Sequence, residues 1–511
     1  MTDLSRREVL ALAGVAGAAS VFAAAPALAA ADPRRDAVVD TLPRVPEIRS
    51  RNGLLKATLT AKTGAAMIAG TSTQGLWTYN GLFVGPCLRV NPGDRLELTV
   101  RNQTPVPINT HFHGCWVSPH GDADNVFIEA EPGKSLTSRL TFPAAHEGGP
   151  FWYHPHVHGN TNESVWYGLS GPIIVNGGVT ALPQFAGCRN RLLVFKGFCL
   201  DPKAAKPTMM SVETAEAKDT LFTINGAYQP IMALRPGETQ IWRLANTGND
   251  GFLRVSLDDH EFTVLSTDGA PVFAPWTTSE VLLVPGARLE VAVTGSDKPG
   301  GYALRTTGFN NGRYGEWLPQ VLATVQVGGP SGKSAKAPKS IAARPSWIDE
   351  KPVKRRLFTL SEGFVDNTPQ FYVNGKVFDH QDMHDPFEVQ LGTVEEWVVR
   401  NDPAIDVGGA FEGHPFHIHV NHFAVVAVGE WNPQTGKVTS YEEVEPQGLR
   451  DAVEVGARRF VVLRTKFKKF HGKTVFHCHI LFHEDMGMMG AFKIVEGMPS
   501  DSGGAGHDHR H

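Results

Sequence analysis

One pattern occurs three times along this chain and limits the folds that it can adopt. Each copy has an Asn-Gly pair, an alternating stretch, a glycine, a second alternating stretch and a closing asparagine, as in "YNGLFVGPCLRVNPGDRLELTVRN", "INGAYQPIMALRPGETQIWRLAN" and "VNGKVFDHQDMHDPFEVQLGTVEEWVVRN". The offset from glycine to asparagine is nine residues each time: Gly93 to Asn102, Gly237 to Asn246 and Gly392 to Asn401. Alternating polarity is typical of half-buried strands, and Asn-Gly is typical of tight hairpins. The repeat predicts an all-β chain with three related domains in tandem.

The spacing of the copies gives the expected domain limits, which are residues 45–178, 190–329 and 351–497. Between the second and third domains, "GPSGKSAKAPKSIAARPSW" is rich in Ser, Lys, Pro and Ala, so we expect a linker with little to bury. Residues 498–511 are polar and glycine-rich and are predicted to be a disordered, histidine-containing tail.

The first 29 residues resemble an export signal. Arg6 and Arg7 precede an Ala/Gly-rich apolar run that ends in Ala27-Leu28-Ala29, a cleavage-like ending that favours a signal peptide over a membrane anchor. The Ser-Arg-Arg start is similar to the twin-arginine signal of bacteria, which predicts a periplasmic or secreted protein. No other stretch is apolar and long enough to span a bilayer. The formal net charge of −4 and the lack of a basic stripe argue against a nucleic-acid partner.

Most of the 21 histidines fall into four clusters at the two ends of the chain. Two clusters lie in the first expected domain and two lie in the third: His111 and His113; His154, His156 and His158; His414, His417 and His419; and His477, His479 and His483. In a strand, residues i and i+2 point to the same face, so each His-x-His pair aims two imidazoles at one place. Imidazole suits Cu, Zn, Fe or Ni, so the clusters predict a metal site.

Cys478 lies between His477 and His479 in "HCHILFHEDMGMM". On a strand its sulfur would face away from those two imidazoles and hold a different metal ion. His483 and Met488 follow closely, and Pro415 sets His414 apart from the pair at 417 and 419. One cysteine, two histidines and a weak axial methionine form the ligand set of a blue-copper electron-transfer site.

With these motifs in this order, the mature chain resembles the three-domain multicopper oxidases, which include laccases, ascorbate oxidase and bacterial copper oxidases. The resemblance implies three cupredoxin-like Greek-key β-barrels and four copper ions per chain. The type 1 ligands would be His414, Cys478, His483 and Met488. The type 2 ligands would be His111 and His417. The type 3 pair would be held by His113, His154, His156, His419, His477 and His479.

The activity implied is one-electron oxidation of a small reductant, coupled to the four-electron reduction of O2 to water. Protons must also reach the oxygen. By position, Glu484 resembles one proton-relay acid of the family. Asp124 resembles the second, with Asp122 as its rival on the same loop.

The electron donor is less well defined by the sequence. Thioethers select Cu(I), but residues 351–413 hold no methionine cluster, so we expect phenols and aromatic amines as the main donors. The alternatives are a cuprous or other metal-ion oxidase and a copper-binding protein without turnover. We expect a monomer. Cys87, Cys115, Cys188 and Cys199 could form disulfides in an oxidising compartment, and the sequence does not assign their pairing.

Overall fold

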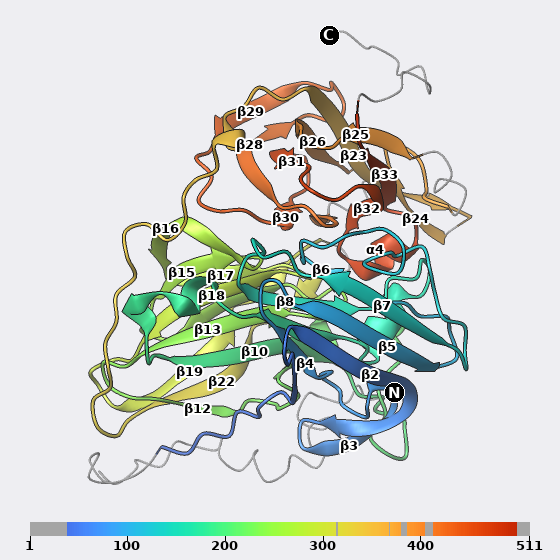
Figure 1. Ribbon diagram of the computed structural model, residues 1–511. Coiled ribbons are helices and arrows are strands. Elements are labelled where there is room, and N and C mark those ends of the chain that lie inside the picture. The colour runs from blue at the N-terminus through green and yellow to red at the C-terminus, as the bar shows by residue number, and fades with distance from the viewer. Residues whose placement is uncertain (1–37, 313–314, 367, 380–385, 404–411, 498–511) are drawn as a thin grey trace.

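The computed structural model describes residues 38–312, 315–366, 368–379, 386–403 and 412–497 (Figure 1). The predicted signal peptide and the predicted tail therefore lie outside the described residues. Strands dominate the described part, so the all-β prediction is confirmed. Its helices are short: α3 (Thr161–Trp166), α4 (Leu481–Asp485) and the 3-10 turns η1 (Gly178–Ala181), η2 (Pro183–Phe185), η3 (Ala217–Asp219) and η4 (Ser346–Ile348).

The first domain consists of two packed sheets with the strand orders β1-β4-β9-β8-β6 and β3-β2-β5-β7. The strands are β1 (Glu47–Arg49), β2 (Leu54–Ile68), β3 (Thr71–Tyr79), β4 (Cys87–Val90), β5 (Arg95–Gln103), β6 (His111–His113), β7 (Ser135–Thr141), β8 (Gly149–His154) and β9 (Gly171–Val175).

The second domain also has two main sheets, ordered β11-β10-β13-β18-β15-β16 and β12-β22-β19-β14-β17, with β20-β21 as a small extra ribbon. The strands are β10 (Arg189–Phe198), β11 (Leu221–Ile224), β12 (Ile231–Leu234), β13 (Thr239–Asn246), β14 (Leu253–Leu257), β15 (Phe262–Thr267), β16 (Ala270–Thr278), β17 (Glu280–Leu283), β18 (Arg288–Thr294), β19 (Gly300–Thr306), β20 (Phe309–Asn310), β21 (Glu316–Trp317) and β22 (Gln320–Val327).

The third domain repeats the plan of the second, with the sheet orders β24-β23-β26-β31-β28-β29 and β25-β33-β32-β27-β30. The strands are β23 (Lys354–Val365), β24 (Thr368–Val373), β25 (Phe387–Gln390), β26 (Val394–Asp402), β27 (His414–Ile418), β28 (Phe423–Trp431), β29 (Val438–Glu443), β30 (Ala452–Val455), β31 (Arg459–Lys466), β32 (Gly472–Cys478) and β33 (Met489–Val495).

The sequence repeat corresponds to a strand crossing from one sheet of a domain to the other. The first strand of each copy (β4, β12 or β25) pairs in parallel with the last long strand of its domain (β9, β22 or β33). The second strand (β5, β13 or β26) pairs in parallel with an early strand of the opposite sheet (β2, β10 or β23). The same crossing occurs three times, so the prediction of three related β-domains is confirmed.

The asparagines of the repeat have the same role in each domain. Asn80, Asn225 and Asn374 have positive φ and are each followed by a glycine of positive φ, as a tight hairpin turn requires. Each asparagine also accepts a backbone N–H at 2.8 Å through Oδ1. The closing asparagines are buried, and each lies within hydrogen-bond distance of at least two backbone carbonyls through Nδ2: Asn102 of Val106 and Ala130, Asn246 of Gly251, Leu283 and Val284, and Asn401 of Glu412 and Val455.

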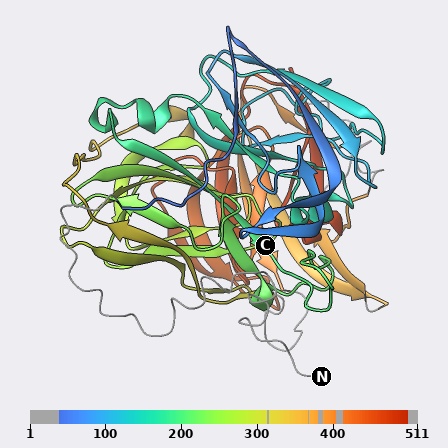
Figure 2. The same ribbon diagram turned by 90° about the horizontal axis from the view of Figure 1, so that it is seen from below.

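The first and second domains lie side by side, and the third lies across both (Figures 1 and 2). Helix α4 of the third domain contacts α3 of the first. The segment expected to be a linker is partly buried, which corrects that prediction. Ile341 bonds to the backbone of Phe273 in the second domain, and Trp347 is only 6% exposed.

Candidate metal centres

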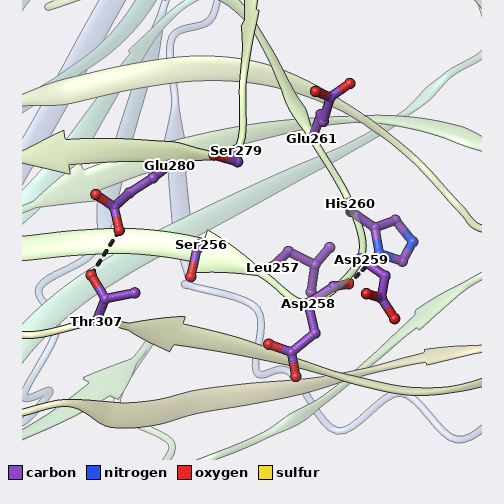
Figure 3. Close-up of a pocket in the computed structure, with 9 residues that line it drawn as sticks. All are labelled: Ser256, Leu257, Asp258, Asp259, His260, Glu261, Ser279, Glu280 and Thr307. Atoms are coloured by element: carbon purple, nitrogen blue, oxygen red, sulfur yellow. Dashed lines mark hydrogen bonds between the residues drawn. The ribbon is translucent and has the colours of Figure 1, made fainter.

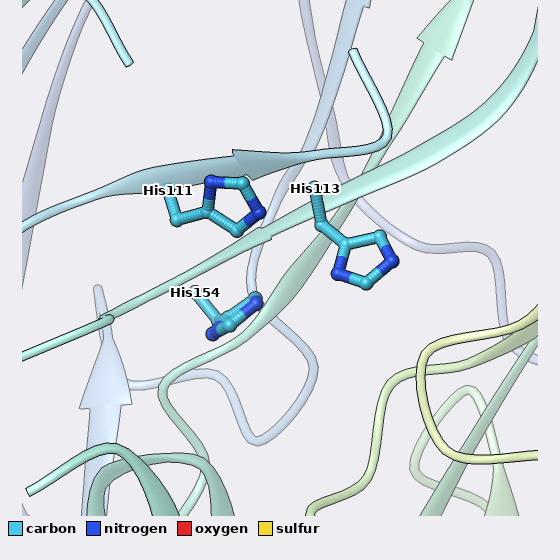
Figure 4. Close-up of side chains that lie close together, drawn as sticks. All are labelled: His111, His113 and His154. Carbon is cyan, nitrogen blue, oxygen red and sulfur yellow. The ribbon is translucent and has the colours of Figure 1, made fainter. Parts of the chain in front are cut away.

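Strand pairing in two domains brings the histidine motifs together. In the first domain β6 pairs with β8, with His111 opposite His154 (Figure 4). In the third domain β27 pairs with β32, with His417 opposite His477. Each His-x-His pair therefore begins on a strand, and the two strands concerned are adjacent in each sheet. His156, His419 and His479 lie just beyond the ends of β8, β27 and β32.

Eight imidazoles from the first and third domains form one buried cluster, which we call the eight-histidine cluster. Its members are at most 2% exposed: His111, His113, His154, His156, His417, His419, His477 and His479. Across the domain boundary, the ring of His111 stacks on that of His419 at 3.8 Å, and the ring of His113 stacks on that of His417 at 3.9 Å.

Two sets of ring nitrogens converge within this cluster. His479 Nε2 lies 3.2 Å from His113 Nδ1. On the other side, His477 Nε2 lies 3.2 Å from the Nε2 atoms of both His156 and His419. Ring nitrogens this close, drawn from two domains, form groups that could hold a metal ion.

The outer nitrogens of the cluster fix the tautomer of several rings. In four rings Nδ1 lies at hydrogen-bond distance from an oxygen: His111 with Asp124 at 2.9 Å, His154 with Pro155 O at 2.8 Å, His417 with Asp451 O at 2.7 Å and His477 with Cys478 O at 2.9 Å. A donating Nδ1–H leaves Nε2 with a bare lone pair. Within the described residues, Nε2 of His111, His154 and His417 is buried and has no hydrogen-bond partner. Such orphaned nitrogens fit a metal ion.

The protonation of the cluster agrees with this reading. Burial, followed by the repulsion of neighbouring imidazoles, lowers the pKa of His111 and His419 well below its usual range, so both rings are neutral as ligation requires. His477 is the exception. Burial lowers its pKa, but the adjacent Glu484 outweighs this effect and raises it.

Cys478 faces away from the cluster into a second buried centre. Its Sγ lies 3.7 Å from Nδ1 of both His414 and His483, and these two Nδ1 atoms lie 3.3 Å apart. Met488 is fully buried, and its backbone oxygen accepts the N–H of Cys478 at 3.0 Å. Burial opposes ionisation of the thiol, but the hydrogen bonds to the two imidazoles outweigh it and lower the pKa of Cys478 to about 7. A thiolate with two imidazoles is a soft site of the blue-copper type.

The two expected relay acids both lie close to the cluster. Asp124 is buried, and its Oδ1 lies 2.9 Å from His111 Nδ1; burial raises the pKa of Asp124 to about 7. Its rival Asp122 is on the surface, where it pairs with Arg139 at 2.7 Å.

Glu484 is fully buried, with Oε2 at 3.0 Å from His477 Nδ1 and Oε1 at 3.5 Å from His156 Nδ1. Burial would raise the pKa of Glu484, but His156 and His477 outweigh it and hold the pKa below its usual range.

Three acids near the centres were not anticipated from the sequence. Asp451 Oδ1 lies 3.3 Å from His113 Nε2 and 3.5 Å from His417 Nδ1. Glu362 lies 3.2 Å from His414 Nε2, and Glu412 lies 3.1 Å from His483 Nε2. Each is a single acid outside any motif, so no local signal marked it.

A surface pocket of about 380 Å³ in the second domain is lined by Ser256, Leu257, Asp258, Asp259, His260, Glu261, Ser279, Glu280 and Thr307 (Figure 3). Arg305 binds Asp258 through two hydrogen bonds, and Thr307 donates to Glu280. All five cysteines are described and none is in a disulfide. In the described residues, no helix has the length and apolar character needed to cross a bilayer.

Sequence comparison identifies the family. Profiles described as multicopper oxidase match residues 60–179, 201–327 and 349–498. The chain belongs to the multicopper oxidase family, and its three domains are cupredoxin-like, as expected.

Individual relatives are similar over most of their length. The chain is 26% identical to multicopper oxidase mco of Staphylococcus aureus, over 89% of this chain and 92% of that protein. It is 23% identical to a laccase of Bacillus subtilis, over 82% and 90%. Among solved structures it is similar to a multicopper oxidase from Campylobacter jejuni described as a metallo-oxidase, with a TM-score of 0.74 and 26% identity over 90% of this chain and 95% of that one. The protein is thus an oxidoreductase that uses copper to oxidise a reductant with O2.

Proposed function

We propose that the chain holds four copper ions, one at Cys478 and three in the eight-histidine cluster. The observation that carries this proposal is the position of Cys478, whose sulfur belongs to one centre while its two neighbours, His477 and His479, belong to the other. Cys478, His414, His483 and Met488 would form the type 1 site. His111 and His417 would hold the type 2 ion, and His113, His154, His156, His419, His477 and His479 the type 3 pair.

When bound, copper supplies the one-electron steps that connect oxidation of the donor to the four-electron reduction of O2. The residues of the chain would provide the path for electrons between the two centres and the groups that transfer protons. The backbone from Cys478 to either flanking histidine is the shortest covalent connection between the two centres. Glu484, whose Oε2 lies 3.0 Å from His477 Nδ1, is placed to pass a proton, and Asp124 beside His111 is placed to do the same from the other side.

Replacing the sulfur atom of residue 478 with oxygen tests this function. Holoprotein should be blue, contain about four coppers per chain and consume O2 with a methoxyphenol as donor. Cys478→Ser should lose the blue colour and O2 uptake, because a hydroxyl does not replace the soft thiolate, while the eight-histidine cluster can still bind copper. A Cys478→Ser protein that stays blue would refute the type 1 assignment. Wild-type protein that binds copper without consuming O2 would favour the storage alternative.

For the donor, we propose phenols and aromatic amines first and Cu(I) second. The sequence lacks a thioether cluster before His414, which supports the aromatic donors. Two contacts support the second candidate. The outer nitrogens of both type 1 imidazoles face carboxylates, the partly exposed Glu362 and the buried Glu412, and negative charge beside the site favours a cationic donor. The similarity to the Campylobacter jejuni metallo-oxidase points the same way.

Comparing kcat/KM for a methoxyphenol and for chelated Cu(I) on one preparation separates these donors. We expect the phenol to be favoured, with Glu362→Gln lowering kcat/KM for Cu(I) several-fold more than it lowers kcat/KM for the phenol, because a change at His414 affects both donors but the lost negative charge affects only the cation. Glu430→Gln, in an exposed ion pair with Arg459, is the control. A Cu(I) preference of a hundredfold or more, about 2.7 kcal/mol of transition-state discrimination, would establish the metal-ion oxidase instead.

We also propose that residues 1–29 direct export by the twin-arginine route to the periplasm or beyond, and that the mature chain acts as a monomer. The domain limits 45–178, 190–329 and 351–497 stay predictions.

A further inference from the structure

A buried guanidinium–carboxylate pair lies where the three domains meet. Arg288 begins β18 of the second domain, and Asp451 directly precedes β30 of the third. Arg288 Nη1 donates to Asp451 Oδ1 at 2.8 Å and Nη2 donates to Oδ2 at 2.6 Å, with both side chains at most 1% exposed. The pair is therefore bidentate and fully withdrawn from solvent.

The remaining donors of Arg288 are also satisfied. They reach three backbone oxygens: Gly286 at 3.0 Å, Asp268 at 2.9 Å and Pro150 of the first domain at 3.3 Å. This one guanidinium thus binds acceptors from all three domains, and its orientation is fixed from every side.

The other side of Asp451 faces the eight-histidine cluster. Its Oδ1 lies 3.3 Å from His113 Nε2, and its backbone oxygen accepts Nδ1–H of His417 at 2.7 Å. His113 differs from its neighbours because its Nδ1, not its Nε2, faces another cluster nitrogen, that of His479. The carboxylate is close to Nε2 without a formed hydrogen bond, and its charge favours the tautomer that keeps the proton on Nε2 and leaves Nδ1 free to bind a metal ion.

Two glycines allow this close approach. At Gly114 a Cβ would lie 2.0 Å from Arg288 Nη2 and 2.4 Å from Asp451 Oδ2. At Gly286 a Cβ would lie 2.9 Å from His479 Nε2 and 3.0 Å from His113 Cε1. Both glycines have positive φ, so a larger residue is excluded by conformation as well as by space. The turn before β18 thus touches the cluster, although the second domain supplies none of its histidines.

The Arg288 guanidinium favours the ionised form of Asp451. Burial would raise the pKa of Asp451, but the charge and hydrogen bonds of Arg288 outweigh it and hold that pKa below its usual range. A buried ion pair is weak evidence for stability, since apolar residues of the same volume often stabilise a fold equally well. A role in orienting the histidines accounts better for a charge at this place.

We propose that Arg288 is a positioning residue for the copper cluster, acting through Asp451 on His113 and His417. This inference rests on the proposed function, and it assigns to the second domain a part in copper retention. Loss of an outer partner of a ligating histidine typically weakens metal binding by about 10- to 100-fold. The same loss is expected when the guanidinium is removed and Asp451 is free to turn.

The experiment measures copper retention directly as well as turnover. Arg288→Gln holoprotein should keep its blue colour but contain less copper per chain, show a reduced type 2 paramagnetic resonance signal, and lose cluster copper to a chelator at about 10- to 100-fold lower chelator concentration. Arg288→Lys keeps the charge but not the bidentate geometry, so its copper retention should lie between that of wild type and that of Arg288→Gln. If Arg288→Gln does not fold, Arg288→Lys and Asp451→Asn make the same test.

The matched control is Arg243→Gln. Arg243 is a buried arginine of the same domain, and it pairs with Glu290 on β18 at 2.9 Å and with Thr180, away from the histidines. The Arg243→Gln protein should keep the copper content of wild type, even if its folding stability changes. Arg288→Gln added to Asp451→Asn should cause little further loss, because both act at one contact.

Full copper retention in Arg288→Gln, equal loss in Arg243→Gln, or fully additive effects of the two substitutions would overturn the proposal. A wild-type protein with neither the blue colour nor the type 2 signal would be a different failure, because it would refute the proposed function on which this inference rests.

Discussion

At the scale of single residues, the two acids proposed as proton relays have different surroundings. Glu484 contacts His156 and His477 and accepts no hydrogen bond from a backbone amide in the described residues. Asp124 accepts the N–H of Phe112 at 2.9 Å as well as facing His111. No backbone amide in the described part of the chain donates to either oxygen of Glu484, so both oxygens stay available to accept and release a proton.

Glu484→Gln should slow O2 reduction by about 10²- to 10⁴-fold while leaving the blue band and the copper content near wild type, since an amide cannot transfer the proton. The measurement is O2 consumption at saturating donor and O2. Asp122→Asn is the control, since Asp122 is an exposed carboxylate on the loop that also carries Asp124. Unchanged turnover in Glu484→Gln would remove this residue from the mechanism.

At the scale of elements, α3 and α4 connect the first domain to the third beside the cluster. Asp485 at the end of α4 accepts the N–H groups of Gly159, Thr161 and Asn162 at the start of α3, at 2.9, 3.1 and 2.7 Å. The first amides of a helix lack internal partners, so this carboxylate from the other domain satisfies them. The contact places Glu484 on α4 against His156 of the first domain.

Strand β10 contains an unusual buried charge. Lys196 is 1% exposed, and its Nζ donates to the carbonyl of Phe83 in the first domain at 3.1 Å. Burial lowers the pKa of Lys196 to about 7. In the unfolded chain the pKa is about 10.4, so between these values the unfolded state binds the extra proton. The free energy of unfolding should therefore rise with pH in this window, by at most about 1.4 kcal/mol per pH unit.

Lys196→Met should remove this dependence and raise the stability at pH 7, offset by about 1 kcal/mol for the lost hydrogen bond. Denaturant unfolding at pH 7 and pH 9 measures both effects. We expect wild type to gain stability between the two pH values and Lys196→Met to gain less. Equal gains in the two proteins would show that Lys196 does not titrate as inferred.

At the scale of the whole molecule, the eight-histidine cluster lies in the boundary between the first and third domains, with four imidazoles from each. Metal ions bound there would hold the two domains together. Without them, several buried imidazole nitrogens lose their partners, which is costly in a low-dielectric interior.

Removal of copper should therefore lower the Tm, by about 1 °C for each kcal/mol of binding free energy lost when the three domains unfold together. Calorimetry of holo, copper-free and zinc-loaded protein makes the comparison. Zinc also binds imidazole but carries no electrons, so it should restore much of the Tm without the blue colour or turnover. The same Tm with and without metal would mean that the cluster does not link the domains.

The sequence by itself determined the all-β class, the three related domains and the candidate ligands. Each depends on a local pattern, such as the nine-residue offset or the two-residue spacing of His111 and His113, and a strand converts such spacing directly into geometry. The separation of Cys478 from its two neighbours follows from the same alternation.

Only the tertiary structure decided which isolated charges join the site. Asp122 and Asp124 look alike in sequence, but one pairs with Arg139 on the surface and the other with His111 in the interior. Arg288 and Asp451 are 163 positions apart and belong to different domains. A contact of this kind has no period or motif, because it exists only after the domains have packed against one another.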